Sequence, residues 1–160
     1  MLQIYFPPPA PTLSMPAFGL TYQVANSTDT TIANTANYYA VAGTSSAGAM
    51  LDVHSASSNH ITIDRAGYYM ISATASLTSA TEQLLHFAVA KNGSVISGVL
   101  ASVTTINPLI GNARHENLAV SCAVFCTVGD IIGLRIRNTT STAAVKVINN
   151  NLVVAKINPY

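Results

Sequence analysis

NHITIDRAGYYMISATASLT, residues 59–78, contains two runs of alternating apolar and polar side chains joined by a turn at Gly67. Such alternation indicates β-strands, because successive side chains of a strand point to opposite faces. The pattern recurs in residues 86–96, which turn at Asn92-Gly93, and in residues 119–136, which break at Gly129-Asp130. Asn-Gly is typical of a two-residue hairpin turn, because both of its positions need a positive φ. These runs predict an all-β protein.

Other segments show the same strand pattern, and none shows a helical period. Further strands are predicted at residues 18–25, 30–33, 38–42, 50–55, 143–148 and 151–157, with loops at 44–49 and 104–117. Short strands at this spacing, separated by Gly and Asn turns, are typical of a β-sandwich or barrel. We therefore predict one two-sheet antiparallel domain over residues 16–160, preceded by an arm at residues 1–15.

The composition is unusually poor in charge. The chain is 49% hydrophobic and only 8% charged, whereas an ordinary soluble domain is about 25% charged. A lone soluble protein normally keeps charges on its surface. The composition predicts that much of the surface is covered by other copies or by a larger assembly. The alternative is a monomer whose surface is solvated by hydroxyls and amides.

Several strands are apolar or small on both faces. Within 119–128, the Ala, Ser and Phe side chains lie opposite a face of Val and Cys, and Leu152 and Val154 alternate with Val153. A strand that is buried on one side only would alternate apolar with polar or charged side chains. Burial on both sides, in a chain without helices, predicts a partner molecule on the second side.

Charge and hydropathy exclude two classes of partner. The net charge is +1, and the seven Lys and Arg residues are scattered singly, so no basic cluster is available to neutralise the phosphates of a nucleic acid. No apolar run approaches the ~18 residues of a membrane helix. The first residues lack the basic leader and long apolar run of a secretory signal. This start predicts a protein that is made and kept in the cytosol, or released without the secretory route as virion proteins are.

Titratable and thiol groups do not form a recognisable catalytic pattern. Cys122 and Cys126 lie about 13 Å apart on one extended strand, too far for a disulfide, and are expected to be buried, reduced and apolar in character. The six carboxylates are dispersed, and only the stretch from Asp52 to Asp64, with His54 and His60, could collect metal ligands. No HExxH spacing, Ser-His-Asp set or phosphate loop is present. The chain is predicted to be no enzyme and to need no cofactor or metal.

The first residues are predicted to form an extended arm. The run 7–11, PPPAP, favours polyproline II and cannot join a central sheet. The residues before it are apolar and are expected to lie on a neighbouring subunit or a larger partner. An alternative is a disordered terminus. The predicted partner-binding residues of the arm are Leu2, Ile4, Tyr5, Phe6, Pro7, Pro8 and Pro9.

Four motifs in order resemble the compact jelly roll of the tumour necrosis factor and complement globular-head superfamily. They are ITIDRAGYYMIS, FAVAKNGSVI, FCTVGDIIGLRI and the closing strand at 152–157. The resemblance covers about residues 18–157 and implies a two-sheet jelly roll that assembles as a trimer. It implies that the strands at 18–25, 68–74, 119–127 and 152–157 form an inner sheet facing the threefold axis. The predicted trimer-interface residues are Phe18, Leu20, Tyr22, Tyr68, Met70, Ser121, Ala123, Phe125, Leu152 and Val154.

The chain departs from the secreted animal members of that superfamily, because it lacks a signal peptide, a collagen-like stalk and a structural disulfide. It resembles more closely the similar domains of bacteriophage particles. The expected function is that of a trimeric capsid decoration (cement) protein, which binds itself and the major capsid protein or another virion protein. One alternative is the receptor-binding tip of a phage tail or head fibre, and another is an adhesive module unrelated to viruses.

Overall fold

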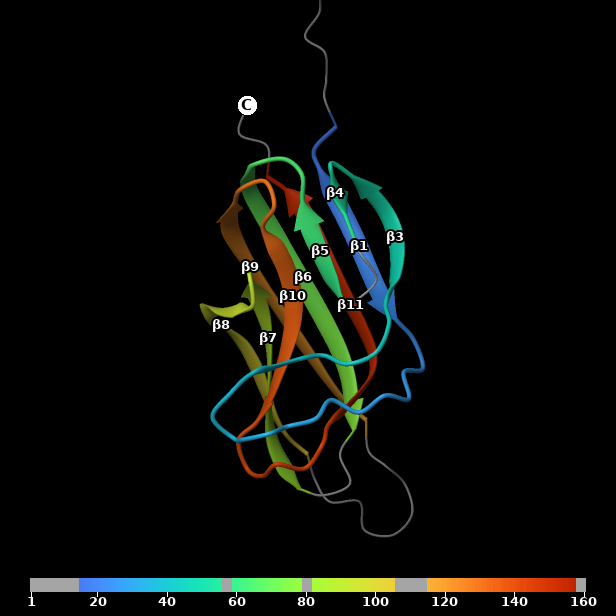
Figure 1. The fold of residues 1–160 in the computed structure, drawn as a ribbon, viewed down its shortest axis with the longest axis vertical. Coiled ribbons are helices and arrows are strands. Elements are labelled where there is room, and N and C mark those ends of the chain that lie inside the picture. The colour runs from blue at the N-terminus through green and yellow to red at the C-terminus, as the bar shows by residue number, and fades with distance from the viewer. Residues whose placement is uncertain (1–14, 56–58, 79–81, 106–114, 158–160) are drawn as a thin grey trace, which may run out of the picture.

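The computed structural model describes residues 15–55, 59–78, 82–105 and 115–157, which form an all-β sandwich (Figure 1). The strands are β1 (Phe18–Gln23), β2 (Tyr39–Ala40), β3 (Ser46–Leu51), β4 (Val53–His54), β5 (His60–Ile63), β6 (Gly67–Thr78), β7 (Gln83–Lys91), β8 (Ser94–Thr105), β9 (Glu116–Cys126), β10 (Ile131–Asn138) and β11 (Lys146–Lys156). Within these residues no helix is long and apolar enough to cross a lipid bilayer.

The strands form two antiparallel sheets packed face to face. One has the order β3-β1-β11-β6-β9, and the other has the order β4-β5-β10-β7-β8, with the short β2 also pairing with β10. The first and last strands are neighbours, and Leu20 lies opposite Val153 in their register. This crossing order is that of a jelly roll, as predicted. The four strands expected to share one sheet do so, as β1, β11, β6 and β9.

The core lies between the two sheets and follows the predicted alternation. In β6 the side chains of Tyr69, Ile71 and Leu77 are fully buried, while Tyr68 and Met70, on either side of Tyr69, are exposed. Phe87 of β7 and Ile136 of β10, among others, fill the space from the opposite sheet. Burial of apolar surface at roughly 25 cal/mol per Å² is the main favourable term for such a core.

The segment between β1 and β3 passes in front of β10 in Figure 1, and within it β2 pairs with β10. The amide nitrogen of Asn26 holds this segment by donating to the carbonyl oxygens of Ala42 at 3.2 Å and Val147 at 2.9 Å. Thr30 exchanges backbone hydrogen bonds with Val145. These contacts give the segment an ordered path although it contains almost no strand.

Several predicted elements differ in the structure. Residues 30–33 were predicted as a strand, but only Thr30 makes an isolated bridge, to Val145. Residues 44–49 were expected to be a loop, but β3 begins at Ser46. The predicted strand 50–55 is divided by Asp52, whose φ of 52° is incompatible with a strand. The predicted strands 143–148 and 151–157 are one strand, β11, with a bulge between Val147 and Asn149. A bulge inserts an extra residue without ending the strand. The run of asparagines at this bulge is typical of a turn, which is why the sequence predicted two strands here.

Candidate interaction surface

The outer face of the sheet β3-β1-β11-β6-β9, here called the five-strand face, is open to solvent. Neighbouring strands place Phe18, Ala155, Met70 and Ala123 in one row across it. Its four long strands turn many uncharged side chains outward, among them Phe18, Leu20, Tyr22, Asn149, Asn151, Val153, Ala155, Tyr68, Met70, Ser72, Thr74, Ser76, Asn117, Ala119, Ser121, Ala123 and Phe125. One charged residue, Lys146, lies at the start of β11 opposite Thr78 and pairs with Asp29 at 3.6 Å.

One end of this face is apolar. Tyr68, Met70 and Phe125 are 56%, 46% and 47% exposed. The rings of Tyr68 and Phe125 meet edge to face with their centroids 5.2 Å apart, a favourable arrangement for aromatic pairs. The apolar half of the face consists of Phe18, Leu20, Tyr68, Met70, Ala123, Phe125, Val153 and Ala155. A contiguous exposed patch of this kind marks an interaction site.

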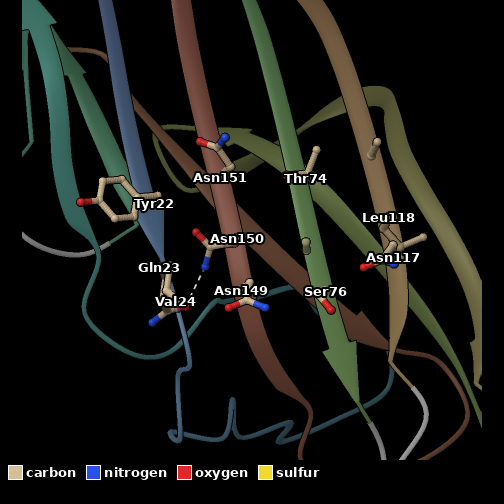
Figure 2. Close-up of a pocket in the computed structure, with 12 residues that line it drawn as sticks. Tyr22, Gln23, Val24, Thr74, Ser76, Asn117, Leu118, Asn149, Asn150 and Asn151 are labelled. Carbon is tan, nitrogen blue, oxygen red and sulfur yellow. Dashed lines mark hydrogen bonds between the residues drawn. The ribbon is translucent and has the colours of Figure 1, made fainter.

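The other end of the face is hollowed and lined by amides and hydroxyls. The hollow has a volume of about 500 Å³ and lies across β1, β11, β6 and β9. Figure 2 shows Tyr22 and Val24 on one side of it and Asn117 on the other, with Thr74, Ser76 and the asparagines of β11 between them. The amide half of the face consists of Tyr22, Thr74, Ser76, Asn117, Asn149 and Asn151.

A buried amide pair supports the hollow from below. Asn150 donates from its amide nitrogen to the side-chain oxygen of Gln23 at 2.7 Å (Figure 2). Gln23 in turn donates to the backbone oxygens of Ala42 at 3.2 Å and Thr44 at 3.4 Å. Both amides are nearly inaccessible to solvent. This network joins β1 and β11, whose residues line the hollow, to the segment between β1 and β3. It thereby holds that side of the hollow in place.

Most predicted trimer-interface residues lie on the five-strand face, namely Phe18, Leu20, Tyr22, Tyr68, Met70, Ser121, Ala123 and Phe125. The prediction was wrong for Leu152 and Val154, which are fully buried between the sheets and cannot contact another chain. Both faces of β11 are apolar here, so alternation alone could not tell which face is inside. The predicted arm residues Leu2, Ile4, Tyr5, Phe6, Pro7, Pro8 and Pro9 lie outside the described residues.

Sequence reasoning missed the asparagines of this surface. Asn149 and Asn151 face outward from β11, the middle strand of the sheet, and Asn117 faces outward from its edge strand β9. An asparagine run within a strand pattern is an unusual signal, because Asn is depleted in strands. The run pointed to this surface, but it was interpreted as a break between two strands.

The outer face of the second sheet is different in character. Arg135 and Arg137 point outward from β10. Arg137 donates from Nε to the backbone oxygen of Thr35 at 2.7 Å and lies over the ring of Tyr38, 5.8 Å from its centroid. Burial lowers the pKa of His86 beside them, and the charge of Arg137 lowers it further. This outer face therefore carries two arginine side chains, one of which is held by Tyr38 and Thr35.

Two further pairs of titratable groups lie near the turn between β5 and β6. Nδ1 of His54 lies 2.8 Å from the Asp64 carboxylate, and Arg65 lies 3.5 Å from Asp52. Among the described residues no three His, Cys, Asp or Glu side chains are placed to hold a metal ion.

Both cysteines are free. Cys126 is fully buried as expected, whereas Cys122 is only partly buried. Burial raises the pKa of the Cys126 thiol to about 11. A thiol with so high a pKa is almost wholly protonated at neutral pH, and it is the thiolate that reacts. Cys126 therefore acts as a small apolar core residue.

Two solved structures share this fold over most of its length. The crystal structure of murine APRIL at pH 5.0 matches with a TM-score of 0.56 and 12% identity, covering 88% of this chain and 99% of that one. The structure of Eiger TNF from S. frugiperda matches with a TM-score of 0.55 and 11% identity, covering 90% and 95%. The chain therefore has a TNF-like jelly-roll fold. Comparisons with protein-family models and with curated proteins gave no match.

Proposed function

We propose that the protein is a structural homotrimer, held together through the five-strand face, that decorates and stabilises a virus capsid. The observation that carries the proposal is this face itself. It presents exposed Tyr68, Met70 and Phe125, and its charged residue Lys146 lies away from them, at the start of β11. A solvent-exposed sheet face normally carries charges, whereas interface cores are depleted in charge and enriched in aromatic residues and Met.

The energetics favour covering this face. Burial of apolar surface contributes about 25 cal/mol per Å², and a stable protein interface buries about 1,600 Å² in total. The apolar half offers three large side chains that are each about half exposed. Large apolar side chains near the centre of an interface usually supply most of its binding energy. A trimer is proposed because the TNF-like resemblance implies one.

A decoration role fits a trimer because a virus shell presents the same binding surface at many equivalent points. A trimer that meets a shell at several equivalent points gains avidity without any new contact. The major capsid protein or another virion protein would be the partner, and the arm at residues 1–15 would reach onto it. The charge-poor composition, 8% Asp, Glu, Lys and Arg, fits a protein that is largely covered in a virion. The receptor-binding tip of a fibre remains the alternative outcome of the capsid test below.

Sedimentation at micromolar concentration tests the self-association. We expect a species of about three times the chain mass of 16.7 kDa. Met70→Lys should convert it to single chains, because an ammonium group would be buried in the interface. The matched control is Leu100→Lys, since Leu100 is 44% exposed against 46% for Met70 but lies on the second sheet. A single-chain wild type at neutral pH would contradict the proposal.

Copy number tests the capsid role separately. Purified protein should bind shells that lack it, and occupancy should rise to hundreds of copies per particle. A few copies at a tail or fibre would instead support the receptor-binding tip. Binding should also make the shells more resistant to heat or low salt. Unchanged shell stability at full occupancy would contradict a stabilising role.

A further inference from the structure

We infer that the rotation axis of the homotrimer passes beside the amide half of the five-strand face, where side-chain amides and hydroxyls of one copy hydrogen-bond with those of the next. The inference rests on the proposed self-association and adds where the copies meet and what sets their register. The occupant of the 500 Å³ hollow is thus another copy of this chain.

Self-complementarity is the first argument. A residue close to a rotation axis meets the same residue of other copies. A charge placed there would face its own sign, which is destabilising. An amide or a hydroxyl carries both donor and acceptor, so it can pair with its own copy. Tyr22, Thr74, Asn149 and Asn151 are all groups of this kind, and the hollow they line has no charged residue.

Unused hydrogen-bonding capacity is the second argument. The side chains of Tyr22, Asn117 and Asn151 make no hydrogen bond to any described residue. Asn149 uses only its oxygen, which accepts from the backbone nitrogen of Ala25 at 3.0 Å. The side-chain oxygen of Asn150, which also lines the hollow, is buried without a partner among the described residues. Leaving such groups unpaired in an interface would be destabilising, so a register that pairs them is favoured.

The two halves of the face then have different tasks. The apolar half supplies non-directional affinity, which would permit several sliding arrangements. The amide half admits few arrangements, because hydrogen bonds require distances near 2.9 Å and near-linear angles. A single buried asparagine can set register and oligomeric state in other symmetric assemblies. The amide half is accordingly the part that selects one closed ring.

The test places a carboxylate beside the axis. Asn151→Asp changes an outward-facing amide to an acid of nearly equal size. At pH 7 we expect the dissociation constant of the trimer to rise at least tenfold, because like charges meet. Lowering the pH to about 4 should restore association as the carboxylates are protonated. Ser102→Asp, exposed on the outer face of β8 in the second sheet, is the control and should change nothing.

A cysteine at the same position gives an independent readout. Asn151→Cys should form a disulfide between identical positions on oxidation, because that bond needs Cα atoms within about 7 Å. The wild type, with its inward-facing Cys122 and buried Cys126, and Ser102→Cys should remain uncrosslinked. The inference is wrong if the wild type is a trimer, Asn151→Asp leaves the trimer intact at pH 7 and Asn151→Cys does not crosslink. That result would leave the proposed self-association in place. A single-chain wild type would instead overturn the proposed self-association.

Discussion

Asn92, in the turn between β7 and β8, donates a hydrogen bond of 2.7 Å to the carboxylate of Asp130, in the turn between β9 and β10. The Asn92 oxygen accepts from the backbone nitrogen of Ile131 at 2.8 Å. The second Asp130 oxygen accepts from the backbone nitrogen of Thr127 at 2.8 Å and lies 3.4 Å from Nζ of Lys91. Two turns that are far apart in sequence are thus one structural unit, at the end of the sandwich that carries the Phe125 ring.

Acid should weaken this unit. The Thr127 hydrogen bond, then that of Asn92, lowers the pKa of the Asp130 carboxyl to about 2 from its ordinary 3.8. A carboxyl whose pKa is lower in the folded state stabilises the fold above its unfolded pKa, and this contribution is lost as the pH falls toward 2. We expect Asp130→Asn to cost about 2 kcal/mol at pH 7, at about 1.4 kcal/mol per pKa unit.

The measurement is urea unfolding at pH 7 and at pH 2.5, at one protein concentration. The difference between wild type and Asp130→Asn should shrink at the lower pH. Asp64→Asn is the matched control, because that carboxylate is 42% exposed, and exposed pairs contribute little. An equal loss at both pH values would show that the charge of Asp130 is unimportant.

Adjacent residues of β11 should differ sharply in their effect on protomer stability. Leu152 is fully buried between the sheets, while Val153 is outward-facing and partly exposed. Leu152→Ala should lower the free energy of unfolding by 2–5 kcal/mol, as is typical of deleting buried methyl groups. Val153→Ala should lower it by less than about 1 kcal/mol in a single-chain background such as Met70→Lys. Similar losses for the two would contradict the assigned inward face of β11.

The buried amides Gln23 and Asn150 should be energetically coupled. Their hydrogen bond of 2.7 Å is shielded from solvent, and removing one partner leaves the other with an unmet polar group. A double-mutant cycle with Gln23→Ala and Asn150→Ala should give a coupling energy of roughly 1–3 kcal/mol in thermal or urea unfolding. The single variants should each cost about as much as the double variant. Additive losses would mean that the pair is not a unit.

Two glycines with similar backbone angles should tolerate alanine differently. Gly43 and Gly129 have φ of 98° and 88°, which would strain any other residue. A Cβ on Gly43 would lie 2.1 Å from the Gln23 amide nitrogen, whereas nothing lies within 4 Å of one on Gly129. Gly129→Ala should cost about 1 kcal/mol, and Gly43→Ala should cost more because it displaces the Gln23 amide. Equal melting temperatures for the two variants would contradict this account.

Local pattern predicted much of the fold. The alternation in β6, the hairpin turn at Asn92 and the turn at Gly129 all follow from short-range rules, and the structure contains them with little change. The bulge at Asn149 was not predictable, because an extra residue leaves no mark on an otherwise polar run. The positive φ of Asp52, which separates β3 from β4, was equally hidden.

By itself, the amino-acid sequence determined that this chain folds as a β-sandwich with a charge-poor surface, because side-chain alternation and turn residues act over a few positions. Only the tertiary structure decided which side of each two-faced strand is the core. Leu152 lies inside and Val153 outside because the bulge and the pairing with β1 and β6 set the register. Pairing between distant strands also brings Tyr22, Thr74, Asn117 and Asn151 onto one surface, and no short-range pattern carries that information.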